Sequence, residues 1–423
     1  MKDQRNYLRE RGITLIALVV TIVVLLILAG VTINAVFSDS GIIKKAQEAQ
    51  NKANESVQKD MEQINALENW LNENTGESNK EVNISTLVGK EAVTKNTKAV
   101  DAYGNKITIP KGFKVLAHGT EAGSATYTYS GDTIPAVQDG IVIEDTQTET
   151  AGNQFVWVPV GTINNKTGDS KGATSTITLG RYSDFTAKDG IYIPTQNAED
   201  YTQEVLIDTD YKELNIFREG TKSENATARD LKTFIETSLA NGGYYIARYE
   251  ASKNTTTNKI ESKYDKTVLK NITQPNAAKI AREMYGEVKE NDKLVYASDL
   301  VNSYAWDTAI IFIQTYSTGT DASSYASKNK STSFAKTGIN PDKYCNICDM
   351  SGNVDESTTE TSINTSFYYV RRGGDYYNTG DYDKASGYTS FRHNQWAGGT
   401  GLRPLLYLNW YCLQVCWTGI KTL

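Results

Sequence analysis

The sequence predicts an α+β fold in which a long N-terminal helix is followed by a β-rich remainder. Three observations lead to this prediction. Residues 13–37 form an uninterrupted apolar run, and between residues 42 and 71 apolar residues recur every three or four positions. After residue 76, runs of β-branched residues are separated by turns that contain Gly or Pro. The chain has 423 residues, which at roughly 150 residues per domain allows two or three folded units.

Composition favours binding over catalysis. Lys and Arg number 44 and Asp and Glu 50, so the net charge is −6, and an acidic chain without a basic stripe argues against nucleic acid as a partner. The 2 His and 4 Cys leave little material for acid–base or metal chemistry. The 26 tyrosines combine a rigid apolar ring with a hydroxyl, which suits binding surfaces. We therefore assign no catalytic residue.

Residues 13–37 are predicted to form a transmembrane helix. The run carries no charged side chain, and it exceeds the roughly 20 apolar residues that cross a bilayer. The preceding residues 1–12 carry a net positive charge from four basic and two acidic residues, namely Lys2, Arg5, Arg9, Arg11, Asp3 and Glu10. This excess keeps the N-terminus in the cytoplasm and exports the residues that follow.

A short basic leader that ends in Gly12 and an apolar run that starts at Ile13 resemble the type IV prepilin class. The resemblance implies cleavage between these two residues and location at a bacterial cell surface, membrane-anchored or in a pilus-like filament. It also implies other pilin-like subunits as partners. Ala17 stands where the family has the glutamate that docks subunits. A plain single-pass anchor is therefore the alternative.

Residues 38–76 are predicted to continue as an amphipathic, pilin-like stem helix. The apolar positions that share one helix face are Ile42, Ala46, Ala49, Ala53, Val57, Met61, Ile64, Leu67 and Leu71. We expect a globular head to cover the end of this stem, because Trp70 would otherwise be exposed.

Residues 77–152 are predicted to be a β-rich region. Turn residues such as Pro110, Gly112 and Gly140 bound short runs of β-branched and aromatic residues. The strands expected here and at the start of the next region are residues 106–109, 113–117, 140–144 and 155–160. His118 is assigned to an exposed loop.

Residues 153–408 contain six segments in a recognisable order. They are NQFVWVPVG, NGGYYIARYEAS, NSYAWDTAIIFI, CDMSGNVDEST, YVRRGGDYY and TGLRPLLYL. The order resembles the formylglycine-generating, sulfatase-modifying family and implies a C-type-lectin-like fold for this region. Most of these residues are expected to pack the scaffold.

A formylglycine-generating-type oxidase activity, which this family suggests, is the least favoured function. The oxidase members bind copper through a cysteine pair near the end of the fold, and one of these thiols would follow Arg403, where this chain has Pro404. Neither Cys345 and Cys348 nor the pair at positions 412 and 416 falls at the matching positions, and the chemistry requires thiolates. Buried thiols, a local disulfide or redox pair, and metal ligation all remain open for these cysteines.

Calcium is the one cofactor that the sequence implies, and the turn in the segment CDMSGNVDEST would bind it. In family members this turn holds the ion through backbone carbonyls and a glutamate, and oxygen ligands of this kind suit Ca²⁺. By that match the candidate ligands are Gly352, Val354 and Glu356. Asp355 and Ser357 replace the family's tryptophans, so a plain acidic turn is the alternative.

Residues 373–408 hold the candidate binding segment. Within it, residues 375–396 combine Tyr, Trp and Arg with Gly, Ser, Asn and Thr, which is the composition of a paratope. The setting between RRGG and GLRP resembles the variable proteins that retroelements diversify, and implies an external protein or glycan as the ligand. The residues that would face it are Tyr376, Tyr377, Asn378, Tyr382, Asp383, Tyr388, Ser390, Arg392, His393, Asn394 and Trp396.

The function predicted from the sequence is that of a surface-displayed ligand-binding protein, adhesin-like or receptor-like. A structural, minor pilin-like subunit is the alternative. The apolar tail at residues 409–423 has no assigned role.

Overall fold

The computed structural model describes residues 81–116, 136–194, 202–203, 231–290, 293–317, 322–328, 333–340, 342–362, 368–376, 384–392 and 399–408. The chain divides into two units, Met1–Asn79 and Lys80–Leu423, and the described residues all belong to the second. The predicted leader with Gly12 and Ile13, the apolar run, the stem and the tail at residues 409–423 lie outside the described residues.

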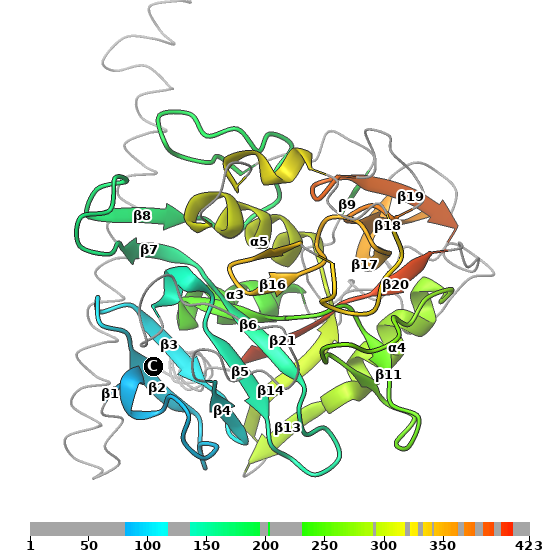
Figure 1. The fold of residues 1–423 in the computed structure, drawn as a ribbon, viewed down its shortest axis with the longest axis horizontal. Coiled ribbons are helices and arrows are strands. Elements are labelled where there is room, and N and C mark those ends of the chain that lie inside the picture. Colours follow the sequence, from blue (N-terminus) through cyan, green and yellow to red (C-terminus); the bar gives the residue numbers. More distant parts are fainter. Residues whose placement is uncertain are drawn as a thin grey trace, which may run out of the picture. The chain divides into compact units, whose positions relative to one another are not determined.

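A seven-stranded antiparallel sheet forms the larger part of the core (Figure 1). In order across the sheet its strands are β13 (Glu287–Glu290), β14 (Lys293–Leu300), β21 (Pro404–Leu408), β10 (Gly243–Ala247), β6 (Gln154–Pro159), β5 (Val142–Asp145) and β4 (Phe113–Val115). All residues of β6 and β10 are buried, as expected for the short apolar runs that the sequence shows there. Strands from the predicted β-rich region (residues 77–152) and from the predicted lectin-like region (residues 153–408) therefore belong to one sheet.

A smaller sheet holds the candidate binding segment. Its strands, in order, are β19 (Tyr388–Arg392), β18 (Tyr368–Arg372), β17 (Asp355–Ser362) and β20 (Thr400–Leu402), and β9 (Thr202–Gln203) also pairs with β17. The pair β17 and β20 is parallel, whereas β17 with β18 and β18 with β19 are antiparallel. The sheet continues outward from β17 to β19 at its edge (Figure 1).

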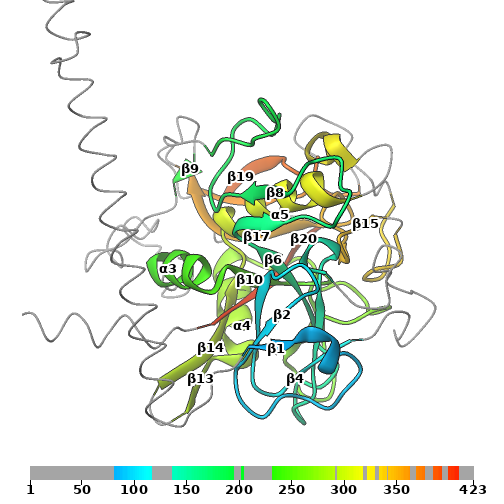
Figure 2. The same ribbon diagram turned by 90° about the vertical axis from the view of Figure 1, so that its left-hand side faces the viewer.

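Three α-helices are described: α3 (Leu231–Asn241), α4 (Gln274–Tyr285) and α5 (Ser303–Tyr316). In Figure 2, α4 lies beside β14 and α5 lies beside β17 of the smaller sheet. Nearly every residue of α5 is buried, and its buried Asp307 forms an ion pair with Arg372 at 3.2 Å. The Asn302 side chain caps α5 by accepting a hydrogen bond from the Ala305 N–H at 2.8 Å.

Short elements complete the described part. They are β1 (Val82–Asn83), β2 (Thr97–Val100), β3 (Lys106–Ile109), β7 (Gly161–Asn164), β8 (Thr174–Ile177), β11 (Ser252–Lys253), β12 (Ile260–Glu261), β15 (Lys343–Tyr344), β16 (Ile347–Cys348) and the 3-10 turns Ile84–Thr86, Val137–Asp139 and Ala322–Ser327. The strands predicted at 106–109, 113–117, 140–144 and 155–160 correspond to β3, β4, β5 and β6, with ends that differ by up to two residues.

The predicted fold class is wrong. The sequence indicated an α+β protein with a long N-terminal pilin-like helix, transmembrane and then amphipathic, a β-rich middle and a C-terminal C-type-lectin-like fold. The described part is instead mostly β with few helices, because β-branched and aromatic runs dominate it and three- or four-residue periodicity does not. A search of the described residues finds no helix that is both long and apolar enough to cross a membrane.

Candidate functional site

The candidate binding segment leaves the smaller sheet and returns to it at the same end. Glu356 in β17 is paired with Arg372, the last residue of β18, and Asp355 is paired with Thr400, the first residue of β20. Both ends of the segment therefore lie beside the start of β17. A Cβ added to Gly399, whose φ is +91°, would lie 3.3 Å from the Asp375 Oδ2 atom, so the two ends are in close contact.

A pair of aromatic rings lies at this junction, one exposed (Phe334) and one half-buried (Tyr376). The Tyr376 and Phe334 ring centroids are 5.4 Å apart with 50° between the ring planes. The Lys270 Nζ atom lies 3.8 Å from the Phe334 centroid and 5.7 Å from the Tyr376 centroid. Phe334 is 37% exposed. These three residues are called the aromatic surface below.

Asn353 fixes the backbone on both sides of the ring pair. Its carbonyl oxygen accepts a hydrogen bond from the Tyr376 N–H at 3.1 Å, and its Oδ1 atom accepts one from the Ala335 N–H at 2.9 Å. The residue has a φ of +66°, a conformation that asparagine tolerates better than most residues. The side chain and the backbone carbonyl of this one buried residue therefore help to set the positions of two rings that come from segments separated in the sequence.

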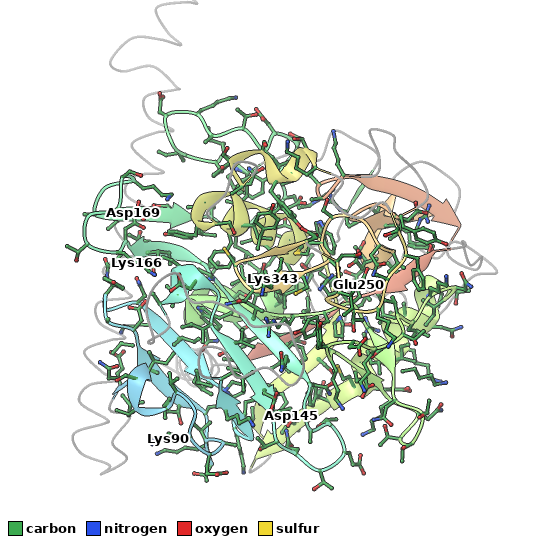
Figure 3. The ribbon with its side chains drawn as sticks, viewed as in Figure 1. Lys90, Asp145, Lys166, Asp169, Glu250 and Lys343 are labelled. Carbon is green, nitrogen blue, oxygen red and sulfur yellow. The ribbon has the colours of Figure 1, made fainter. Side chains whose placement is uncertain are left out.

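Glu250, which is labelled in Figure 3, supports Asn353 through a buried hydrogen bond. The Asn353 Nδ2 atom donates to Glu250 Oε2 at 2.5 Å, and the Val354 N–H donates to Glu250 Oε1 at 3.1 Å. Burial raises the pKa of Glu250 well above its usual value, and the charges of Asp349 and Glu356 raise it further.

A second buried contact ties the smaller sheet to the larger one. Arg403, between β20 and β21, donates from Nη2 to Glu356 Oε1 at 2.8 Å, and both side chains are 0% exposed. The same guanidinium donates to the carbonyl oxygens of Ala247 at 3.1 Å and Asp349 at 2.9 Å. Burial raises the pKa of Glu356, while Arg403 opposes that shift.

The predicted calcium ligands do not fit a calcium site. The Glu356 carboxylate is paired with Arg403, and a guanidinium in hydrogen-bond contact with a ligand oxygen would repel the cation. Within the described residues no group of three or more His, Cys, Asp or Glu could hold a metal ion.

The other predicted site residues fall into two sets. Tyr388, Ser390 and Arg392 lie in β19, at positions paired with Arg372, Val370 and Tyr368 of β18. Seven lie outside the described residues, namely Tyr377, Asn378, Tyr382, Asp383, His393, Asn394 and Trp396. Tyr376 is the predicted ligand residue whose side chain the structure places.

A fixed turn at residues 384–387 divides the candidate segment. The Ala385 carbonyl accepts a hydrogen bond from the Trp306 indole at 2.9 Å, and the Ala385 and Ser386 N–H groups donate to the carbonyls of Lys328 and Ala326 at 2.9 and 3.0 Å. Ala385 is completely buried. The tyrosine-rich segment is therefore not one continuous exposed surface.

Sequence reasoning missed Lys270 and Phe334. Phe334 is a lone aromatic residue in a stretch otherwise rich in Lys, Ser and Thr, which is a weak signal of an exposed ring. Lys270 precedes α4 without a distinguishing motif. Their proximity arises from the tertiary fold.

The described cysteines do not favour thiolate chemistry. Cys345 and Cys348 are both free, and burial raises the pKa of each thiol to about 12. The nearby Arg248 opposes the shift at Cys348 without cancelling it. Both groups are therefore protonated near neutral pH. Cys412 and Cys416 lie outside the described residues.

Comparison with known proteins adds little to this geometry. No family model matches the chain, and no curated protein matches it. Among solved structures, Treponema denticola variable protein 1 aligns with a TM-score of 0.27 and 12% sequence identity, over 62% of this chain and 98% of that one. Its name agrees loosely with the expected resemblance to variable proteins, and neither the pilin nor the formylglycine-generating resemblance gains support. A likeness this slight carries no argument, so the function is argued from the residues themselves.

Proposed function

We propose that this chain is a ligand-binding protein and that the aromatic surface forms part of its binding site. The observation that carries the proposal is the ring pair of the exposed Phe334 and the half-buried Tyr376, in contact with Lys270, at the point where both ends of the tyrosine-rich segment meet. Aromatic rings that stay exposed at a defined position contribute much of the binding energy in protein interfaces.

The support beneath these rings agrees with a binding role. Asn353 holds the backbone beside both rings, and Glu250 in turn holds Asn353. Contacts that are already in place before a ligand arrives reduce the entropy lost on binding.

The ligand in this proposal is an external protein or glycan, bound by a protein displayed on a bacterial cell surface. The support for display is the sequence alone, which is basic before residue 13 and apolar from there to residue 37. Digestion of intact cells with an added protease tests this part, since a displayed chain is cleaved and an internal one is protected.

The test of binding uses the full chain, a phage-displayed peptide library and a glycan array as probes. We expect at least one probe to bind the wild-type chain and to lose affinity by about thirtyfold in Tyr376→Ala, the loss typical of a central aromatic contact. Phe334→Ser should weaken the same probe.

The matched control is Ile339→Ser, which removes another exposed apolar side chain from the same described segment and should leave affinity unchanged. If every bound probe binds wild type, Tyr376→Ala and Phe334→Ser equally, the aromatic surface is not a binding site. If no probe binds, the proposal fails for these two ligand classes.

A further inference from the structure

Lys270 occupies a fixed position on the aromatic surface. Its ammonium lies over the Phe334 ring, at 3.8 Å from the centroid. The residues on both sides are hydrogen-bonded to neighbouring segments, because the Leu269 N–H donates to the Ala251 carbonyl at 2.8 Å and the Asn271 side-chain Oδ1 atom accepts from the Gly399 N–H at 3.2 Å. The charge is therefore held close to the junction described above.

Three acidic residues of the segments near this junction form ion pairs with other cations, while the buried Asp375 lies beside Gly399. Asp355 forms an ion pair with Arg371, Asp265 with Lys336, and Glu261 with Lys263; the distances are 2.5, 3.0 and 2.8 Å. Within the part of the chain that the structure describes, no carboxylate forms an ion pair with Lys270. The chain has a net charge of −6, yet among the described residues Lys270 places a positive charge without an ion-pair partner beside the exposed Phe334 ring and the half-buried Tyr376 ring.

We infer that the ligand of this surface is an acidic segment of a protein partner, in which a carboxylate binds Lys270 and a neighbouring apolar side chain packs on Tyr376 and Phe334. This inference rests on the proposed binding function and adds the class of ligand. A carboxylate would accept a charge-assisted hydrogen bond from the ammonium, and complementary charge would also speed association.

The ring geometry favours a polypeptide over a sugar. A sugar ring packs flat on the open face of one aromatic ring, yet the Lys270 ammonium already covers one face of Phe334. The 50° angle between the two rings leaves no shared plane for a sugar, whereas single side chains can fit against inclined rings.

The test selects peptides from a random phage-displayed library on the full chain, with an array of neutral and sialylated glycans in parallel. We expect the selected peptides to be enriched in Asp or Glu next to aromatic or aliphatic residues. Lys270→Glu should weaken them by about tenfold, mainly through slower association, and added salt should weaken wild type but not this variant.

The conservative variant Lys270→Arg should retain binding, and Lys270→Met covers the case in which charge reversal disturbs the fold. Lys266→Glu is the matched control, because Lys266 is an exposed lysine of the same segment. It should bind peptides as wild type does.

The outcomes separate this inference from the proposed function. Selected peptides without acidic enrichment that bind Lys270→Glu and wild type equally, but require Tyr376, would overturn the ligand class and leave the binding function standing. Capture of glycans in place of peptides, again requiring Tyr376, would do the same. If no probe requires Tyr376, both fail.

Discussion

Asn353 donates to Glu250 across 2.5 Å in the interior of the protein, and neither side chain is exposed. The same asparagine accepts hydrogen bonds from the backbone of Ala335 and Tyr376. The segment that follows β10 is therefore connected through this asparagine to both segments that carry the Phe334 and Tyr376 rings.

Replacement of this asparagine should weaken the fold and the binding surface together. Asn353→Ala removes the donor to the buried Glu250 carboxylate and the acceptor for the half-buried Ala335 N–H. We expect the free energy of unfolding to fall by about 2–4 kcal/mol, measured by urea denaturation. Asn258→Ala is the control, since Asn258 has a similar φ of +63° but lies in an exposed turn. Equal losses in the two variants would show that backbone strain, and not the amide contacts, is responsible.

The ion pair of Arg403 and Glu356 should be costly to break from one side. Arg403→Met leaves a fully buried carboxylate without its cation, and we expect a loss of about 3–5 kcal/mol in the free energy of unfolding. Adding Glu356→Met should restore much of that stability, because the remaining charge is then gone. A double variant that is as unstable as the single one would mean that packing of the guanidinium, and not its charge, is what matters.

Stability should fall as the pH rises from about 4 to 7. Burial raises the pKa of Asp342 to about 7 and that of Asp349 to about 6, and the charge of Asp349 adds to the shift at Asp342. Both pKa values exceed the aspartate pKa of the unfolded chain, which is about 4. The stabilisation of the folded state by these two carboxyl groups is therefore fully present below that unfolded-state pKa. It is lost as the pH rises through the folded value, by up to about 1.4 kcal/mol per pH unit for each group.

The contribution of Asp342 can be isolated by comparing variants. Asp342 accepts hydrogen bonds from Tyr325 and from the Ser351 N–H, and Arg403 opposes its pKa shift. Asp342→Asn should reduce the slope of the unfolding free energy against pH by the amount that corresponds to about one bound proton. The exposed Asp189→Asn should not change this slope. An unchanged slope in Asp342→Asn would contradict the assignment.

Gly373 should not tolerate a side chain. Its φ is +90°, and an added Cβ would lie 2.7 Å from Glu356 Oε2 and 3.1 Å from the Trp306 ring. Gly168 has a φ of +84° with nothing within 4 Å of an added Cβ, so Gly168→Ala reports the backbone penalty alone. We expect Gly373→Ala to lose about 1–3 kcal/mol more than this control in thermal or urea unfolding. A matching loss would mean that the site relaxes around the methyl group.

Local patterns identified several elements of the fold. The short apolar run from Phe155 to Val160 predicted β6, and apolar residues at helical spacing after Trp306 predicted part of α5. The α+β prediction is wrong because it extends the helical periodicity of an N-terminal segment to the fold class of the whole chain. The described part is governed by strand pairing, which joins β21 near the end of the chain to β10 and β14.

The candidate site was less predictable because its contacts are not local. The composition of residues 375–396 pointed to the segment that contains Tyr376, but Phe334 and Lys270 join it only through tertiary packing. Likewise, Glu356 is separated by 47 positions from the arginine that neutralises it, so its suitability for calcium could not be judged from the turn sequence.

The turn fixed by Trp306 at Ala385 has a consequence for how this protein can change. Ala385 is completely buried, so a larger side chain there would have to displace its neighbours. A substitution at this position therefore lowers stability instead of altering a binding surface. Sequence change that keeps the fold is expected to spare this residue.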